Sequence, residues 1–224
     1  MERTAIVTGG AGGLGVAVTE AMAADGWRVV VPVEPGSAGS AEREGVSLVE
    51  ADLTDPGDVA RVAREAGEGV GAVVNLVGGF HAPGRVHETP VEAFEAQLRL
   101  NLRPGYLMTA AALPAMLAAG RGAVVCVSSR AALRPFSGAA GYITAKAAVL
   151  AFVDALDAEY RDDGIRVNAV LPSVIDTPGN RAAMPDADHD RWVAPSEIAQ
   201  VIRFLCSEAA AATSGAHVPV YGRA

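Results

Sequence analysis

A tyrosine and a lysine four residues apart, Tyr142 and Lys146, are the residues of this sequence best suited to proton chemistry. Residues at this spacing share one face of a helix. A phenol has an ordinary pKa near 10 and is a weak base at neutral pH. A neighbouring ammonium group stabilises the phenolate and lowers that pKa. The pair therefore predicts a centre that exchanges a proton with an alcohol or a forming alkoxide.

Two further polar residues are candidates for the same centre. Ser129 lies 13 residues before Tyr142 and ends an apolar run. Open α/β sheets bind ligands beyond the carboxyl ends of their strands, so its hydroxyl is expected to hold the substrate oxygen beside the phenol. Asn101 lies inside a helical stretch, where asparagine is unfavourable, and Pro104 disturbs the same turn. A strand-ending serine and a tolerated polar residue at a helix kink are the alternative interpretations.

A cluster of glycines separates the first apolar run from the first helical stretch. Its members are Gly9, Gly10, Gly12, Gly13 and Gly15. Glycines allow a sharp turn and the close approach of a pyrophosphate, which then meets free N–H groups at the positive end of the helix. The position in the first strand-to-helix turn favours dinucleotide binding over a merely structural turn. No Gly-Lys-Ser/Thr follows, which argues against a nucleoside triphosphate site.

Short β-branched runs alternate with alanine-rich helical stretches along the whole chain. The expected strands are Thr4–Thr8, Arg28–Val33, Val46–Glu50, Ala72–Val77, Ala123–Ser128, Ile165–Leu171 and Ala216–Val220. The expected helices are Gly15–Ala24, Pro56–Glu65, Pro90–Ala119, Ala139–Arg161 and Pro195–Ser207. The strand runs are nearly all apolar, as in strands that helices cover on both faces. We therefore expect one domain over residues 1–224, an α/β fold with a doubly wound parallel sheet of about seven strands (a Rossmann fold). Segments 34–45 and 176–194 are expected to be loops.

Composition limits the classes of partner. The net charge of −8 and the pI of about 5.0 argue against nucleic acid and against a polybasic membrane anchor. No run reaches the roughly 18 apolar residues of a membrane span, and no signal peptide is recognisable, so a cytoplasmic protein is expected. Cys126 and Cys206 have apolar neighbours and are expected to be buried, reduced thiols. The four histidines lack metal-ligand spacing, so no metal site is expected.

The ordered set of motifs resembles the classical short-chain dehydrogenase/reductase family. Residues 8–15 match Thr-Gly-x-x-x-Gly-x-Gly, and residues 142–146 match Tyr-x-x-x-Lys. Asp52 and Leu53 follow the third expected strand, and residues 75–78 stand where the family has Asn-Asn-Ala-Gly. Leu76 and Val77 depart from that motif, and residues 171–173 read Leu-Pro-Ser where the family usually has Pro-Gly. The resemblance covers essentially the whole chain.

This resemblance implies a role for each matching residue. The implied catalytic set is Asn101, Ser129, Tyr142 and Lys146. The implied cofactor-binding set is Gly9, Gly13, Leu14, Gly15, Glu34, Asp52, Leu53, Asn75, Gly78, Tyr142, Lys146, Pro172, Ile175 and Thr177. In the family the lysine also binds the nicotinamide ribose, the asparagine holds a water that links the lysine to solvent, and the residues matching Asp52 and Leu53 hold the adenine edge.

The implied function is an NAD(P)-dependent oxidoreductase that transfers a hydride between nicotinamide and a carbonyl or secondary alcohol, a small molecule. A 3-oxoacyl-thioester (acyl carrier protein) reductase is the alternative within the enzymes. A non-catalytic, cofactor-sensing regulator is the alternative of another class.

Cofactor choice depends on the end of the second expected strand. Val33 stands where many NAD-dependent members carry aspartate, and Glu34 follows it. A carboxylate there accepts the ribose 2′-hydroxyl and repels a 2′-phosphate, which favours NAD over NADP. A more distant basic residue such as Arg43 could reverse this preference.

The helical stretch Ala145–Ala158 is apolar on most sides and contains Leu150 and Phe152. One face is expected to cover the sheet and the other to pack on a second subunit. In the family two long central helices build such an interface, which predicts a homodimer or homotetramer. A core helix in a monomer is the alternative.

Overall fold

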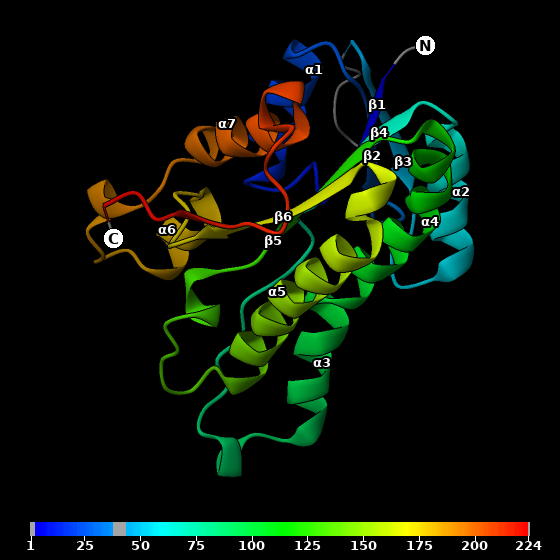
Figure 1. The fold of residues 1–224 in the computed structure, drawn as a ribbon. Coiled ribbons are helices and arrows are strands. Elements are labelled where there is room, and N and C mark those ends of the chain that lie inside the picture. Colours follow the sequence, from blue (N-terminus) through cyan, green and yellow to red (C-terminus); the bar gives the residue numbers. More distant parts are fainter. Residues whose placement is uncertain (1–2, 38–43, 224) are drawn as a thin grey trace.

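The computed structural model describes residues 3–37 and 44–223. Its centre is a parallel sheet in the order β3-β2-β1-β4-β5-β6-β7 (Figure 1). The strands are β1 (Thr4–Thr8), β2 (Arg28–Val33), β3 (Val46–Glu50), β4 (Val70–Asn75), β5 (Gly122–Val127), β6 (Ile165–Pro172) and β7 (His217–Val220). The predicted doubly wound fold is confirmed. The order reverses between β1 and β4, and open sheets bind ligands at the carboxyl ends of the strands beside such a reversal.

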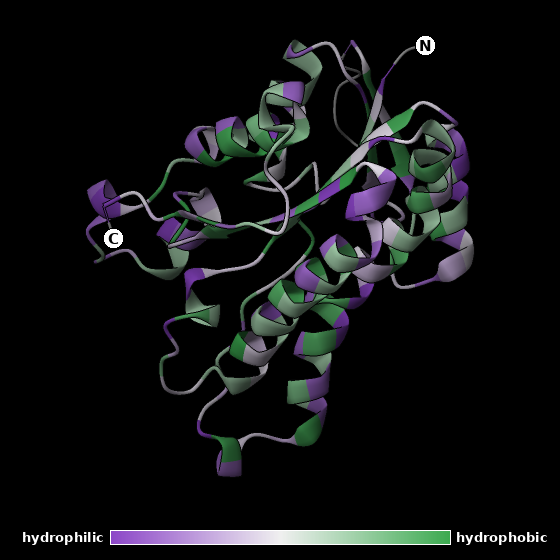
Figure 2. Ribbon diagram, in the orientation of Figure 1, coloured by the Kyte–Doolittle hydropathy of each residue, from purple (hydrophilic) through white to green (hydrophobic). Residues whose placement is uncertain are grey.

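Two apolar layers hold helices on the two faces of the sheet. One face carries α1 (Gly15–Ala24) and α7 (Pro195–Cys206), and the other carries α2 (Pro56–Ala66), α4 (Arg103–Ala119) and α5 (Ala140–Tyr160). Successive side chains of a strand point to opposite faces. On β1, Ala5 and Val7 therefore pack with α1 and α7, whereas Ile6 packs with the other layer. Figure 2 shows hydrophobic residues along the strands and hydrophilic residues on the outer surface of α2.

The long helix predicted over Pro90–Ala119 is wrong, because the structure divides it into α3 (Val91–Asn101) and α4. Pro104 has no amide hydrogen and cannot donate to the carbonyl four residues earlier, which removes a bond at the junction. The Asn101 side chain bonds the backbone of Gln97 and of Gly79. α3 then runs alongside α5, away from the sheet (Figure 1).

The segment expected as a loop over 176–194 contains a short helix, α6 (Pro178–Ala183). Thr177 caps it by accepting a hydrogen bond from Asn180 N at 3.2 Å, and Pro178 occupies its first turn. The sequence held this signal, since a threonine before a proline is a common helix start. Of the other expected loop, residues 38–43, including Arg43, lie outside the described part of the chain.

Both cysteines are free and buried, as predicted. Burial raises the pKa of the Cys126 thiol to about 11 and that of Cys206 to about 12. Within residues 3–37 and 44–223, no helix is long and apolar enough to cross a membrane. The same residues contain no cluster of three or more side chains suited to a metal ion.

Candidate active site

The start of α5 places Tyr142 at the carboxyl edge of the sheet. Gly141 lets α5 approach α3 closely, since a Cβ on Gly141 would lie 3.2 Å from Phe94 Cα and 3.3 Å from Gln97 Cγ. Ser129 follows β5, and its side chain forms a hydrogen bond with that of Tyr142. The phenol is thus next to the serine that the 13-residue spacing selected.

The structure separates the two neighbouring serines. The Ser128 hydroxyl is buried and donates to the backbone carbonyl of Lys146 at 2.7 Å, which ties β5 to α5. The Ser129 hydroxyl stays at the surface of the site, where it also accepts from Ala131 N at 3.1 Å. Ser128 therefore positions the helix, and Ser129 faces the phenol.

Lys146 is buried beneath Tyr142, with 5% of its surface exposed. Its Nζ donates to the Val127 carbonyl at 3.0 Å and lies 5.9 Å from the centroid of the Tyr142 ring. A Cβ on Gly78 would lie 3.0 Å from this Nζ, so the glycine leaves room for the ammonium group. Burial lowers the pKa of Lys146 to about 8.

The structure contradicts the expected lowering of the Tyr142 pKa. Burial raises the pKa of the phenol, and the hydrogen bond with Ser129 opposes that rise in part. The Phe80 ring packs edge-on against Tyr142, with centroids 5.1 Å apart, and contributes to this burial. Tyr142 is therefore a protonated phenol at neutral pH, in the form that donates a proton to a carbonyl oxygen.

Asn101 anchors the loop that follows β4. Its Oδ1 accepts from Gly79 N at 3.1 Å, and its Nδ2 donates to Gly79 O at 3.0 Å. A Cβ on Gly78 would lie 2.6 Å from Asn101 Oδ1 as well as close to Lys146 Nζ. The break between α3 and α4 thus brings Asn101 and Lys146 to the same glycine from different helices.

The glycine turn after β1 is too tight for other residues. Gly9 has φ +68°, and Gly12 N donates to Gly9 O at 3.0 Å to close the turn. A Cβ on Gly15, the first residue of α1, would lie 1.9 Å from Gly9 O. The turn presents its backbone at the N-terminus of α1, which is the arrangement that accepts a pyrophosphate.

Gly15→Ala is expected to destabilise the protein by about 3 kcal/mol, the upper end of overpacking effects, and to abolish cofactor binding. The reason is that the added methyl group cannot coexist with the Gly9 carbonyl. Gly179→Ala is the matched control, because a Cβ there meets nothing within 4 Å. Urea unfolding and cofactor titration of both variants are the measurements. A Gly15→Ala protein with normal stability would contradict the tight turn.

The segment after β6 closes one side of the glycine turn. A Cβ on Gly13 would lie 2.9 Å from Thr177 Cγ2, so two residues far apart in the sequence meet here. Ile175 forms a bridge with Val193 and accepts a hydrogen bond from Asn180 Nδ2 at 2.8 Å. Thr177 therefore borders the expected pyrophosphate turn.

The residues expected around the adenosine differ in how exposed they are. Glu34 is exposed just beyond the end of β2. The Asp52 carboxylate accepts from Thr54 N and Oγ1, and these bonds lower its pKa, while Leu53 is buried in the core. Asn75 points into the core, where its Nδ2 donates to Thr109 Oγ1 at 3.0 Å.

Asn75 and Thr8, the first residue of the glycine motif, stabilise the strands beneath the site. Asn75 Oδ1 is buried without a hydrogen-bond partner among the described residues. Thr8 Oγ1 accepts from Leu76 N at 3.1 Å and so joins the ends of β1 and β4. The sequence analysis missed Phe80, because nothing in the sequence distinguishes this residue from others in the same loop.

Comparison with known proteins decides the family. A sequence model of the short chain dehydrogenases matches residues 3–188. The chain belongs to the short chain dehydrogenase family. It is 33% identical to 2-(R)-hydroxypropyl-CoM dehydrogenase of Xanthobacter autotrophicus, over 99% of this chain and 98% of that protein. It is 32% identical to the acetoacetyl-CoA reductase of Allochromatium vinosum, with the same coverage of 99% and 98%.

Solved structures of the same family agree with this assignment. One short chain dehydrogenase/reductase family protein superposes with a TM-score of 0.89 at 33% identity, covering 98% of this chain and 96% of that chain. The protein is accordingly an oxidoreductase that acts on alcohol or carbonyl groups with a nicotinamide cofactor. As a short chain dehydrogenase it has its glycine turn and its Tyr-x-x-x-Lys pair at the same edge of the sheet.

Proposed function

We propose that Tyr142 exchanges the proton with the substrate oxygen during interconversion of a carbonyl and a secondary alcohol. The observation that carries the proposal is the position of the phenol, which is bonded to Ser129 and lies above the buried Lys146. The Ser129 hydroxyl holds the substrate oxygen in reach of the phenol. The nicotinamide supplies or accepts the hydride when it is bound.

Lys146 and Asn101 are proposed to act as a unit beneath the phenol. The Lys146 ammonium favours the phenolate that remains after proton transfer and, as in the family, binds the nicotinamide ribose. Asn101 fixes Gly79 and the backbone next to Gly78, which keeps the space for the lysine open. Because one sheet supports this unit and the glycine turn, we propose that residues 1–224 work as a single domain.

The glycine turn and the residues beside it fit the cofactor. Gly9, Gly13, Leu14 and Gly15 would hold the pyrophosphate, with Thr177 at its side. Pro172 and Ile175, at and after the end of β6, would complete the cofactor site, and Asp52 with Leu53 would hold the adenine edge. Asn75 acts from the core by fixing the end of β4.

A panel of ketones and alcohols, followed by the absorbance of the reduced nicotinamide with both cofactors, tests the proposal. We expect turnover of at least one carbonyl compound. Acetoacetyl-CoA belongs in the panel, because the similarity to an acetoacetyl-CoA reductase supports a 3-oxoacyl-thioester reductase as the second candidate. Tight cofactor binding without turnover of any substrate would instead favour a cofactor-sensing regulator.

We expect NADH to bind more tightly than NADPH. The exposed Glu34 carboxylate stands at the end of β2, where it would accept a ribose hydroxyl and repel a phosphate. Glu34→Gln should reduce the preference about fivefold, the scale of one charge interaction of roughly 1 kcal/mol near water. Glu68→Gln, on the loop before β4, is the control. Fluorescence titration that finds NADPH bound more tightly by the wild-type protein would overturn the assignment.

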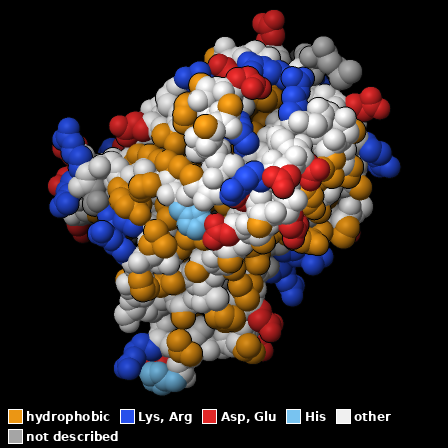
Figure 3. Space-filling view, viewed as in Figure 1, with side chains coloured by type: hydrophobic (Ala, Val, Ile, Leu, Met, Phe, Trp, Pro, Cys, Tyr) orange, Lys and Arg blue, Asp and Glu red, His pale blue; other side chains and the backbone are white. Residues whose placement is uncertain are grey.

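We also expect the protein to form at least a dimer through α4 and α5. Leu150 was expected to contribute to this surface, but it is buried in the core, whereas Phe152 is half-buried and contacts Tyr106. An exposed apolar stripe on α4 consists of Tyr106, Ala110, Pro114 and Leu117. Figure 3 shows further hydrophobic side chains over the part of the molecule where Figure 1 places α3 and α5.

Sedimentation at micromolar concentration measures the assembly. The expected mass is at least twice the 22.8 kDa of one chain. Tyr106→Glu should shift the protein to monomer, because a charge in an apolar interface is costly. Phe204→Glu, at an exposed phenylalanine of α7, should leave the mass unchanged. A wild-type protein that sediments only as a monomer would rule out the interface.

A further inference from the structure

An exposed phenylalanine, Phe80, contacts the proposed acid/base, and a second exposed phenylalanine, Phe136, lies next to Phe80. Phe80 is 62% exposed and Phe136 is 50% exposed, and their ring centroids are 6.2 Å apart. Phe80 also packs edge-on against Tyr142, with the planes at 86°. The two residues come from different loops, after β4 and after β5, and we call them the aromatic wall. Adjacent exposed apolar groups indicate a binding site more often than apolar residues scattered singly over a surface do.

Hydrogen bonds hold the aromatic wall in place. Gly79, which precedes Phe80, is bonded through both its N–H and its carbonyl to the Asn101 side chain. Gly84 N donates to Gly138 O at 3.3 Å and links the two loops. The rings therefore have a fixed backbone while their surfaces remain open, which is the condition for preorganised recognition.

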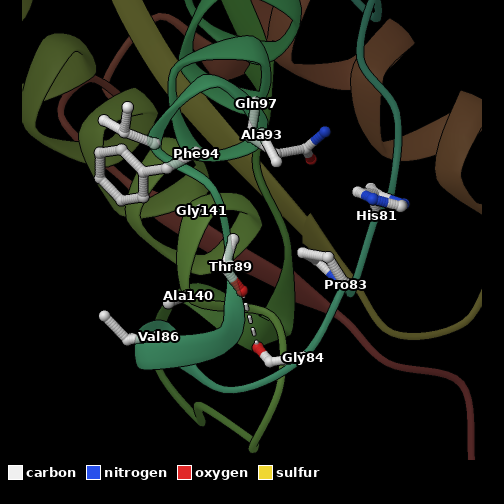
Figure 4. Close-up of a pocket in the computed structure, with 11 residues that line it drawn as sticks. His81, Pro83, Gly84, Val86, Thr89, Ala93, Phe94, Gln97, Ala140 and Gly141 are labelled. Carbon is white, nitrogen blue, oxygen red and sulfur yellow. Dashed lines mark hydrogen bonds between the residues drawn. The ribbon is translucent and has the colours of Figure 1, made fainter.

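The loop after β4 also lines a cavity of about 210 Å³. His81, Pro83, Phe94, Gln97 and Gly141 are among its lining residues, and Phe80 is not (Figure 4). Two successive residues of this loop therefore have different surroundings: His81 lines the cavity, whereas Phe80 packs against Tyr142. The ring of Phe80 is directed toward Tyr142.

We propose that the substrate carries a flat aromatic group next to its carbonyl carbon, and that Phe80 and Phe136 bind this group and select for it. The proposal rests on Tyr142 as the acid/base. A third ring at the ordinary spacing of 4.5–7 Å from two tilted rings completes an aromatic cluster and covers the surface they expose. Such a ring would lie beside the phenol, so its attached carbonyl oxygen would reach Tyr142 and Ser129.

Matched ketones separate the effect of a flat substrate ring from the effect of an apolar substrate group. Acetophenone and cyclohexyl methyl ketone have rings of equal carbon number, but only the first is planar, and 2-butanone lacks a ring. We expect kcat/KM for acetophenone to exceed that for cyclohexyl methyl ketone about tenfold. Phe80→Ala and Phe136→Ala should each reduce this ratio about fivefold, the scale of one aromatic contact. Phe80→Tyr should retain the ratio, and Phe80→Leu should lose it.

Phe204→Ala is the control, because Phe204 is an exposed phenylalanine of α7, on the other face of the sheet. It should leave all three ketones unchanged. A wild-type ratio near one overturns the proposal, and so does an equal loss for all three ketones in Phe80→Ala. Either result leaves Tyr142 as the acid/base untouched, whereas normal turnover of 2-butanone by Tyr142→Phe would remove the proposed function itself.

Binding to the Tyr142→Phe protein gives a readout that does not depend on turnover. This variant keeps the ring that Phe80 contacts, so calorimetric titration compares acetophenone with cyclohexyl methyl ketone in an intact site. We expect acetophenone to bind about tenfold more tightly and the difference to fall about fivefold in Tyr142→Phe/Phe80→Ala. Equal affinities for the two ketones would refute recognition by the aromatic wall.

Discussion

Tyr142→Phe is expected to lower kcat by about 10² or more, the usual scale of general acid/base catalysis. The substitution removes the hydroxyl that Ser129 bonds but keeps the ring that packs against Phe80. Cofactor affinity should stay within about twofold, because Lys146 and the glycine turn are unchanged. Steady-state kinetics on the substrate found in the ketone panel, with cofactor titration alongside, are the measurements.

Tyr160→Phe is the matched control for this variant. Tyr160 is the last residue of the same helix, α5, five turns away from Tyr142, so loss of its hydroxyl should leave kcat unchanged. Near-normal turnover of Tyr142→Phe would show that the phenol is structural. A proportional loss in Tyr160→Phe would point to a general effect on α5 instead of a proton transfer at Tyr142.

Lys146→Met is expected to lower kcat by about 10² or more and also to weaken cofactor binding. The variant removes the buried ammonium that serves the phenol and, as we propose, the ribose. Only Lys146→Met is expected to weaken cofactor binding, so measuring it together with Tyr142→Phe separates the two roles of the lysine. Lys146→Met with normal cofactor affinity would assign the lysine to the phenol alone.

The same variant should change how stability depends on pH. Burial lowers the folded-state pKa of Lys146 to about 8, below its ordinary 10.5. Below pH 8, Lys146 is protonated in both the folded and the unfolded chain, so the folded chain bears the full free-energy cost of burying the charge. Between pH 8 and 10.5 the unfolded chain binds a proton that the folded chain has lost, so the free energy of unfolding rises with pH, by about 3 kcal/mol in total.

Urea unfolding of the cofactor-free protein from pH 7 to 10 measures this rise. Other groups titrate in both proteins, so the difference between wild type and Lys146→Met isolates the lysine. We expect the difference to shift by about 2–3 kcal/mol in favour of the wild type between pH 7 and pH 10. Parallel profiles would mean that Lys146 keeps an ordinary pKa in the folded chain.

Local pattern was enough to predict most of the fold. The apolar runs and the glycine turn act over a few residues, so their structural consequences can be read from neighbouring positions in the sequence. The strand bounds were accordingly close, and the parallel order followed from the alternation of strands and helices. The main error was the prediction of one helix where the structure has a break after Asn101, although the position of Pro104 indicated such a break.

The sequence by itself also determined that Tyr142 and Lys146, which we propose as the reacting pair, share a helix face, because they are four residues apart. Only the tertiary structure decided their environment. The contact of Gly13 with Thr177, the place of Phe80 beside the phenol, and the packing of Gly78 against Lys146 join residues that are distant in the chain. A pKa depends on burial and neighbouring groups, so its direction for Tyr142 was set by these long-range contacts and not by the motif.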